Sequence, residues 1–370
     1  MTEIATPTVT DAHIVAEIQG RVGCLTLNRP RALNALSLDM IRAISQALLD
    51  WRDNDTVLAV VVRGCSKGGP FGAFCAGGDI RFFHQAALGG DPRLEDFFTE
   101  EYTLNHLIHT YPKPYIAIMD GIVMGGGMGI SQGASLRIVT ERSQLAMPET
   151  GIGLFPDVGG GYFLSRCPGR LGEYLALTGR VLGGREAMAA GLADGCIDSG
   201  RLAGLWASLG TTPFENGASV ERWCTSHLST TAGPAGWPQL EVDRIFALSG
   251  MLQIMAALDA TDSEWARSTA PVLRTRSPLM LHVVLEQIRR ARGLGLADNL
   301  RMERGMVRQC FHWRGAAQSE TVEGVRALAV EKDHAPRWNP ARLEDVTPQQ
   351  IAAFFEQPWP AHAHPLRGLN

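Results

Sequence analysis

The chain has 370 residues, of which 45% are hydrophobic and 19% are charged, and its formal net charge is −4. A chain of this length and composition forms a well-buried core and has room for more than one lobe. The small negative charge excludes a general attraction to nucleic acid or to an anionic membrane, although a polyanionic small ligand needs only a local cluster of basic groups.

The seven cysteines are scattered, and none of them forms a C-x-x-C pair. This pattern argues against a disulfide framework or a zinc site, and no H-E-x-x-H or comparable metal-binding spacing occurs. The opening residues contain acids and lack the apolar segment of a secretory signal. The most apolar window, Tyr115 to Ile130, is too short to span a bilayer and contains Asp120 and five glycines. We therefore expect a cytoplasmic protein that holds no metal ion.

The first half of the chain alternates strand and helix patterns. Residues 14–18 and 22–27 predict a hairpin, and Ser37 is placed to cap the helix that follows it. The continuous β-branched run at 58–62 is typical of a strand buried on both faces. The later elements expected are strands at 115–119 and 136–140, and helices near 98–111 and from the glycines at 125–127 onward. Strands separated by helices indicate right-handed crossovers and a mainly parallel sheet.

The pattern becomes almost wholly helical after about Gly195. Long helices are expected at 278–292, 296–313 and 320–330, and the Pro- and His-rich end at 357–370 is expected to fray. The chain is therefore divided into an α/β core that carries the active site (1–198), a helical C-terminal region (199–345) and a tail (346–370).

Two glycine-rich turns can present backbone N–H groups to a ligand. In AFCAGGDI (residues 73–80), Gly77 and Gly78 permit positive φ and close approach, although Asp79 also fits as the cap of an ordinary strand-to-helix turn. In MGGGMG (124–129), a helix begins within the glycines, so its free N–H groups suit a phosphate or a carbonyl oxygen that becomes anionic. A close contact between helix and sheet is the structural alternative.

The most informative segment is AMPETGIGLFPDVGGGYFL, residues 146–164. It places Glu149 and Asp157 in an apolar stretch with no Lys or Arg before Arg166, and both burial and a like-charged neighbour raise a carboxyl pKa. Asp157 also fits as the cap of a helix through Tyr162 and Phe163, whereas Glu149 has no such role. Acids near free amides suggest acyl chemistry on a carbonyl substrate. No Ser, Cys or His triad emerges.

Together these segments resemble the crotonase superfamily, also called the enoyl-CoA hydratase/isomerase superfamily. Within it they are most similar to the 3-hydroxyisobutyryl-CoA hydrolase branch. The resemblance covers nearly the entire chain, apart from a looser stretch at 199–262. The motifs that carry it are LTLNRPRALNALS (25–37), FCAGGDIR (74–81), TEEY (99–102), MPETGIGLFPDVGGGYF (147–163), LALTGR (175–180), SPLML (277–281) and EGVRALAVEKDHAPRWNP (323–340). The resemblance implies an α/β fold, a crotonase-like spiral of ββα turns with a helical C-terminal region.

The resemblance also implies roles for five residues. The amides of Gly78 and Gly126 would form the oxyanion hole, and Gly126 would also line the acyl site. Glu149 would be the catalytic acid, Asp157 the second acid of the hydrolase branch, and Glu101 a further acid that contacts the substrate.

One departure from the hydratases favours hydrolysis. Hydratases place a second glutamate two residues after the GGG run, where this chain has Gly129. Addition of water across a double bond uses two acids, so the loss of the second glutamate argues against hydration. We expect hydrolysis of a small 3-hydroxyacyl-CoA thioester such as 3-hydroxyisobutyryl-CoA. An enoyl-CoA hydratase or isomerase is the alternative, and a catalytically idle CoA-binding protein is the third hypothesis.

An acyl-CoA is thus expected as substrate, with CoA as part of the substrate and no retained cofactor. Its phosphates need basic partners, for which Arg29 and Arg31 are candidates, whereas Arg289, Arg290 and Arg292 are assigned to an exposed helix face. No nucleic acid or membrane partner is expected, and self-association into a homo-oligomer is common on the scaffold that the chain resembles.

Overall fold

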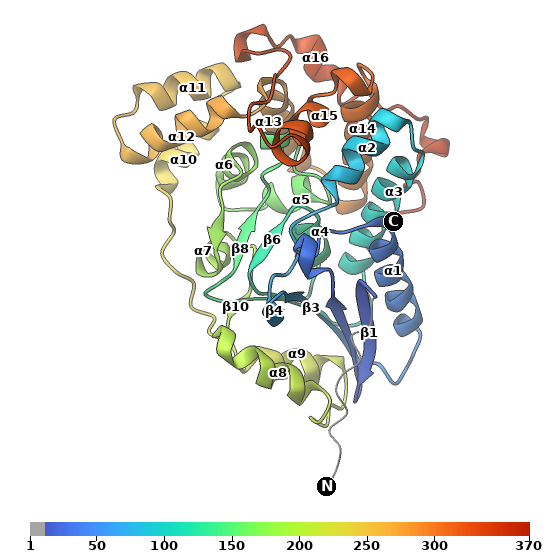
Figure 1. The fold of residues 1–370 in the computed structure, drawn as a ribbon. Coiled ribbons are helices and arrows are strands. Elements are labelled where there is room, and N and C mark those ends of the chain that lie inside the picture. Colours follow the sequence, from blue (N-terminus) through green and yellow to red (C-terminus); the bar gives the residue numbers. More distant parts are fainter. Residues whose placement is uncertain (1–11) are drawn as a thin grey trace.

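The computed structural model describes residues 12–370 and is built around one mainly parallel sheet (Figure 1). Strands β1 (Ile14–Gln19) and β2 (Val22–Leu27) form the predicted antiparallel hairpin. Beyond β2 the sheet continues in parallel through β3 (Ala59–Ser66), β5 (Tyr115–Met119), β7 (Leu136–Val139) and β10 (Gly195–Cys196). The expected parallel arrangement is therefore confirmed, and β4 (Gly69–Gly72) folds back antiparallel on β3.

A second, three-stranded sheet stands beside the first and was not predicted. It contains β6 (Ile122–Met124), β8 (Gln144–Ala146) and β9 (Leu182–Gly183). Strands this short carry no readable alternation of apolar and polar residues, so the sequence pattern does not reveal them. The small sheet matters for the site because Met124 ends β6 and Pro148 follows β8.

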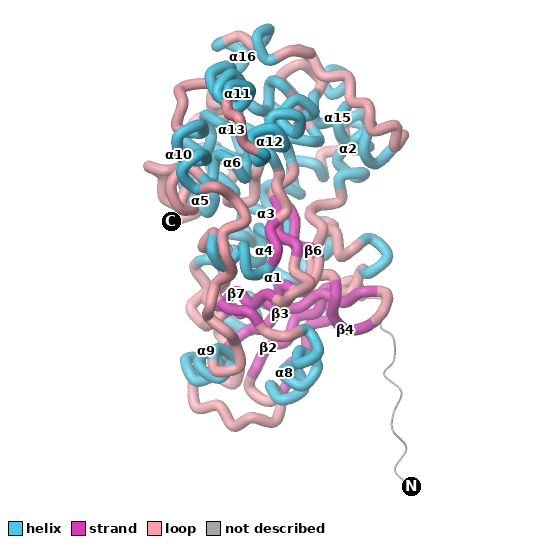
Figure 2. Tube along the Cα trace, turned by 90° about the vertical axis from the view of Figure 1, so that its left-hand side faces the viewer, coloured by secondary structure: helices cyan, strands magenta, loops and turns pink. Residues whose placement is uncertain are grey.

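The main sheet separates two hydrophobic clusters. Along β3, Val60 and Val62 face the larger cluster, whereas Val61 faces the smaller one, as the period of two in a strand requires. The smaller cluster is closed by α8 (Leu202–Leu209) and α9 (Gly217–Thr225), which lie below the sheet in Figure 2. Burial on both faces explains why the strand reads as a continuous apolar run.

The helices of the first half lie on the side of the larger cluster. Ser37 caps the first of them as predicted, because its side chain accepts a hydrogen bond from the Met40 amide. The second long helix begins at Arg93 rather than near Phe98. Its first turn is largely polar, so the apolar periodicity that predicts a helix becomes visible only after that turn. The helices are α1 (Leu38–Arg52), α2 (Ile80–Gly89), α3 (Arg93–His109), α4 (Gly126–Gln132), α5 (Gly160–Leu164), α6 (Leu171–Thr178) and α7 (Gly184–Ala189).

The C-terminal helices form the upper half of the molecule in Figure 1. The three predicted long helices are confirmed, although the last one ends in a single π-helical turn at Arg326–Val330. The helices are α10 (Gln239–Phe246), α11 (Met251–Ala260), α12 (Glu264–Thr275), α13 (Pro278–Ala291), α14 (Leu296–His312), α15 (Glu320–Val325) and α16 (Pro348–Ala353). Because α13 packs on α6, α14 on α3 and α15 on α2, this region is in contact with the core along its length.

The prediction that residues 357–370 fray is wrong. Leu366 is 1% exposed, and Arg301 on α14 donates a hydrogen bond to its carbonyl at 3.2 Å. The ring of Trp359 lies against the guanidinium group of buried Arg304. Two apolar anchors thus hold a segment whose content of Pro and His suggested disorder. The proposed boundaries at 198 and 345 remain predictions.

Candidate active site

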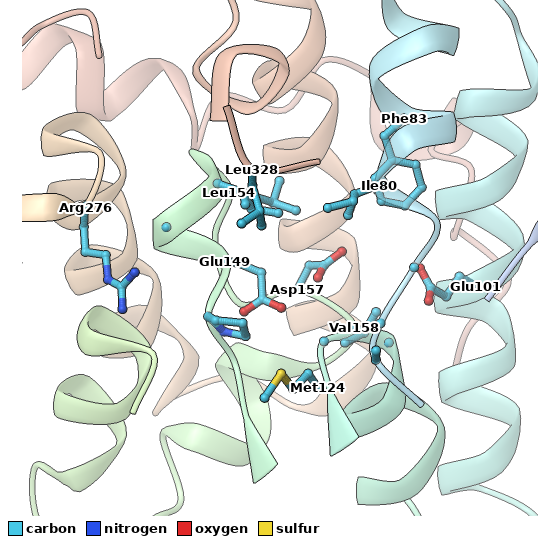
Figure 3. A pocket seen from close by; sticks show the side chains of 18 residues that line it. Ile80, Phe83, Glu101, Met124, Glu149, Leu154, Asp157, Val158, Arg276 and Leu328 are labelled. Atoms are coloured by element: carbon cyan, nitrogen blue, oxygen red, sulfur yellow. The ribbon is translucent and has the colours of Figure 1, made fainter. Parts of the chain in front are cut away.

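One pocket of about 370 Å³ brings together five of the residues singled out in the sequence (Figure 3). Its walls come from the loop before α2, from α3, from the end of β6 and from the segment after β8, and Leu328 of the C-terminal region also lines it. The five are Gly78, Glu101, Gly126, Glu149 and Asp157. Segments far apart in the chain therefore meet at one place.

Glu149 is fixed by a short 3-10 turn, Glu149–Ile152, that follows β8. Pro148 precedes the turn, and the Leu154 amide donates to the Glu149 carbonyl at 3.0 Å. The C-terminal region holds the same segment, since the Ser277 amide donates to the Thr150 carbonyl at 3.1 Å. The backbone of Glu149 is thus held from two sides, while its side chain points into the pocket towards Asp157 (Figure 3).

Asp157 does not cap a helix, so that alternative is wrong. The following helix α5 begins at Gly160 and has no side-chain cap, whereas the carboxylate of Asp157 accepts a hydrogen bond from the Tyr102 hydroxyl at 2.8 Å. The next residue, Val158, has φ +53°, a left-handed conformation that is unfavourable for a β-branched side chain. Such strain costs about 1 to 3 kcal/mol and is found at sites where the surrounding structure enforces it.

The amides of Gly78 and Gly126 are both free to bind a ligand. Hydrogen bonds with Leu36 engage the Gly77 carbonyl and the Asp79 amide, on either side of the Gly78 amide. Gly126 opens α4, so its amide has no acceptor in the helix. Within residues 12–370 no acceptor pairs with either amide. Two unpaired N–H groups lining one pocket are the arrangement that binds an oxyanion.

The structural alternatives for the two turns are also correct in part. The side chain of Asp79 caps α2 through the Phe82 amide, as an ordinary strand-to-helix turn requires. A Cβ at Gly127 would lie 2.4 Å from the Cys75 carbonyl oxygen, so this glycine serves the close contact between helix and neighbouring backbone. Each turn therefore combines a packing role with an amide that lines the pocket.

The three acids of the pocket are buried and form no ion pair with any Lys, Arg or His of residues 12–370. Burial, and then the charge of Asp157, raises the pKa of both Glu149 and Glu101 well above the ordinary range. Burial raises the pKa of Asp157 to about 6, although the hydrogen bond from Tyr102 opposes that rise. Glu149 Oε2 and Glu101 Oε1 are buried and have no hydrogen-bond partner in the described structure. Acids of raised pKa with free oxygens suit proton transfer near neutral pH.

The position of the missing hydratase glutamate is closed to a side chain. A Cβ at Gly129 would lie 2.7 Å from Val158 Cβ and 2.9 Å from Asn105 Nδ2. Val158 directly follows Asp157, so the backbone that brings Asp157 into the pocket also fills the space beside Gly129. A second acid at this point is therefore excluded by packing as well as by sequence.

Arg29 and Arg31 do not line the pocket. The Arg29 guanidinium forms an ion pair with Asp79 at 2.8 Å and donates to the Ala35 carbonyl at 2.9 Å, so it braces the loop that contains Gly78. Arg31 is exposed. Their expected contact with the CoA phosphates remains a prediction.

Three functional candidates were missed in the sequence. Tyr102 belongs to the TEEY motif, but only the fold shows that its hydroxyl reaches Asp157. Leu328 covers the pocket from the π-helical turn (Figure 3). Arg276, just before SPLML, lines the pocket on the far side of Glu149 from Glu101 and donates to the Thr178 carbonyl at 2.6 Å. Burial lowers the pKa of Arg276. The sequence marked these three residues only through the family motifs in or beside which they lie.

Residues 12–370 contain no group of three or more His, Cys, Asp or Glu side chains that could hold a metal ion. In the same range, no helix combines the length and the apolar character needed to cross a bilayer.

Sequence comparisons agree with this geometry. The family model described as enoyl-CoA hydratase/isomerase matches residues 22–355. A protein named 3-hydroxyisobutyryl-CoA hydrolase, mitochondrial, from Rattus norvegicus is 41% identical over 352 residues, which cover 93% of this chain and 89% of the relative. A protein named probable 3-hydroxyisobutyryl-CoA hydrolase 3 from Arabidopsis thaliana is 38% identical and covers 94% of this chain and 92% of its own length.

Two crystal structures share the fold over almost the whole chain. One, called a carnitinyl-CoA dehydratase from Mycobacterium thermoresistibile, has a TM-score of 0.83 and 36% identity and covers 94% of this chain and 97% of its own. The other, called an enoyl-CoA hydratase from Rhodobacter sphaeroides, has a TM-score of 0.81 and 35% identity. It covers 93% of this chain and 97% of its own. The expected crotonase-like fold is confirmed, and the chain belongs to the enoyl-CoA hydratase/isomerase family.

Proposed function

We propose that this protein hydrolyses the thioester of a small 3-hydroxyacyl-CoA, 3-hydroxyisobutyryl-CoA in the first instance, to the free acid and CoA. The observation that carries the proposal is the pairing of two free amides, those of Gly78 and Gly126, with Glu149 in one pocket whose second acid is Asp157 rather than a residue at 129. Two relatives that match most of the chain are named as hydrolases of this thioester.

The amides of Gly78 and Gly126 would bind the thioester oxygen and stabilise the negative charge that develops on it. Loss of one such donor costs about 10²- to 10³-fold in rate. Glu149 acts in one of two ways. As a general base it takes a proton from water while the water oxygen bonds to the carbonyl carbon. As a nucleophile it attacks that carbon itself, and water then hydrolyses the mixed anhydride.

In both routes the tetrahedral intermediate collapses by breaking the bond between carbon and sulfur, and the CoA thiolate leaves and is protonated. Asp157, held by Tyr102, would orient the 3-hydroxyl group or the attacking water. Glu101, next to Gly126, would contact the acyl group: a Cβ at Gly126 would lie 2.7 Å from Glu101 Oε1, so these two residues touch the same space.

Thiol release from 3-hydroxyisobutyryl-CoA, compared with a panel of other acyl-CoA esters, tests this function directly. We expect the small 3-hydroxyacyl ester to react fastest and Glu149→Gln to abolish the reaction. Release at background rate by the wild type would instead leave a CoA-binding protein without catalysis. A single turnover in ¹⁸O-water separates the two routes, because label in the Glu149 side chain requires the nucleophilic one.

The second candidate function is hydration or isomerisation of a short-chain enoyl-CoA. It is favoured by the names of the two solved structures, which are a dehydratase and a hydratase. The closed space at Gly129 opposes it, since Glu149 would have to act without a second acid at that position. Loss of the enoyl absorbance of crotonyl-CoA at a rate above thiol release would favour this candidate.

CoA is part of the substrate in this proposal, and no retained cofactor or metal takes part. Exposed Arg31 is the better of the two predicted partners for the CoA phosphates, because Arg29 is already paired with Asp79. A cytoplasmic location and self-association remain predictions; several relatives are named as mitochondrial proteins.

A further inference from the structure

A buried glutamate outside the pocket holds the backbone that follows Asp157. Glu303 on α14 is fully buried. Its Oε2 accepts a hydrogen bond from the Gly159 amide at 2.8 Å, and its Oε1 accepts one from the Gly161 amide at the same distance. One carboxyl group thus bridges two amides of the glycine-rich turn immediately after Asp157.

Two further side chains of the C-terminal region complete this contact. Asn299 donates to Glu303 Oε1 at 2.8 Å, and Gln287 on α13 donates to the same oxygen at 3.2 Å. The Gln287 amide nitrogen also donates to the carbonyl of Pro156, the residue before Asp157, at 2.7 Å. The segment 156–161 is therefore held on both sides of Asp157 by helices from the second half of the chain.

This contact has no cation, which separates it from an ordinary buried ion pair. No Lys, Arg or His in the described range lies within ion-pair distance of Glu303, whereas the equally buried Glu173 is paired with Arg170 and Arg292. A buried carboxyl group without a counter-ion destabilises the fold unless its hydrogen bonds compensate. Here all four donors come from the Asp157 segment or from side chains beside it.

The segment needs such support because its backbone is strained at Val158, a β-branched residue with φ +53°. Gly159, at φ +88°, follows it without strain because glycine adopts positive φ readily. A Cβ at Gly161 would lie 2.6 Å from Asn299 Oδ1, so the close approach of α14 requires glycine there. Released from Glu303, Val158 would relax towards an ordinary conformation, and the Asp157 carboxylate would turn away from the Tyr102 hydroxyl.

We propose that Glu303 is a positioning residue, which fixes the strained segment 156–161 so that the Asp157 carboxylate meets the substrate in the pocket. The inference rests on the proposed function, because it assigns Glu303 a part in the same reaction. The charged or titratable groups that face it are Asp157, in the segment it holds, and Tyr102, on α3.

The test compares Glu303→Gln, Asp157→Asn and the double variant. Glu303→Gln keeps the size of the side chain but replaces one acceptor oxygen by a donor. Because a small misplacement of a reacting group costs up to about 10²-fold in rate, we expect kcat to fall about tenfold to a hundredfold while KM changes less than about threefold. If Glu303 acts only through Asp157, the double variant is no slower than Asp157→Asn alone.

Glu173→Gln is the matched control, since it removes a buried carboxyl group that does not touch the segment. Its effect should multiply with that of Asp157→Asn. Losses that also multiply for Glu303 and Asp157 would overturn the proposal and leave Glu303 a residue of the fold alone. Melting temperatures show whether each variant is folded. Gln287→Leu removes the contact with Pro156, and combining it with Asp157→Asn repeats the comparison of single and double variants from the other side of the segment.

Hydrogen exchange makes the result independent of catalysis. In Glu303→Gln the amides of residues 157–163 should exchange at least tenfold faster than in the wild type, while those of α1 keep their rates. Unchanged exchange in this segment would overturn the inference even in an active enzyme. Conversely, a wild type that releases no thiol would refute the proposed function and still leave the exchange result to decide the role of Glu303.

Discussion

The chain buries carboxyl groups in two different ways. On α6, Glu173 is fully buried between Arg170 and Arg292, at 3.0 and 2.6 Å, so its negative charge is balanced. In and behind the pocket, Glu149, Asp157 and Glu303 are buried and form no ion pair with any of the described residues. In the first arrangement two arginines compensate the buried charge; the second leaves acids whose pKa is raised.

This difference explains where chemistry is possible. Both oxygens of the Glu173 carboxyl group are engaged by guanidinium groups and lie outside the pocket, so this group is not placed to exchange a proton with a substrate. An unpaired carboxyl group binds its proton more tightly and can return it at a pH near neutral. The structure pays for this in stability, and the four donors around Glu303 offset part of that cost.

The largest expected effect is that of Glu149→Gln. Since the general base or nucleophile is lost, thiol release should fall by about 10³-fold or more, while the melting temperature stays the same or rises because an unpaired buried acid is removed. Glu173→Gln should do the opposite: activity stays within about twofold, and stability falls by about 1 to 3 kcal/mol as charged hydrogen bonds are lost. Thiol-release assays and urea denaturation of both variants measure the contrast, and a similar loss of activity in both would refute it.

The site residues were predictable from sequence to the extent that each lies in a local pattern. Glu149 and Asp157 lie between glycines and prolines, and Gly78 and Gly126 lie in glycine-rich turns, so the segments could be recognised locally. The roles of the individual residues came from the resemblance to the crotonase superfamily. The hairpin, the parallel strands and the three long C-terminal helices follow from periodicity, which is likewise a local pattern.

The remaining features depend on contacts between distant segments. The hydroxyl of Tyr102 meets Asp157 across 55 residues, and Glu303 meets Gly159 across 144. On its own helix, Glu303 has the appearance of an ordinary polar residue, since a pattern of one helix does not show what packs against it. The docked tail was mispredicted for a similar reason: two anchors, Trp359 and Leu366, outweigh a composition that is otherwise typical of a frayed end.

A second prediction concerns the closed space beside Asp157. Gly129→Glu, which restores the acid of a hydratase, should not produce hydration of crotonyl-CoA, because its Cβ alone would lie 2.7 Å from Val158 Cβ. Displacement of Val158 moves Asp157, so thiol release should fall about tenfold or more, with a loss of about 1 to 3 kcal/mol in stability from overpacking. Gly129→Ala is the matched control for the steric part. Hydration by Gly129→Glu would show that the pocket accepts a second acid after all.

A smaller effect is expected for Tyr102→Phe. Its hydroxyl stabilises the ionised form of Asp157, so its removal raises the pKa of Asp157 further above about 6. Where the ionised form is required, the acid limb of kcat against pH should move to higher pH, and the rate at neutral pH should fall about tenfold or less. Tyr115→Phe serves as control, because its hydroxyl is buried away from the pocket residues and has no hydrogen-bond partner in the described structure. An acid limb that does not move would separate Tyr102 from the ionisation of Asp157.

The last prediction concerns the pH dependence of stability rather than activity. Burial raises the pKa of Glu303 to about 8 in the folded protein, from an ordinary value of 4.5 in the unfolded chain. Between these values the folded state binds more protons than the unfolded state, so this group's contribution is fully present below about pH 4.5 and is lost as the pH rises through about 8. In Glu303→Gln the decline of unfolding free energy with pH should therefore be less steep, by up to about 1.4 kcal/mol per pH unit. Urea denaturation from pH 5 to 9 measures both slopes, and parallel curves for wild type and Glu303→Gln would mean that the four donors keep Glu303 ionised throughout.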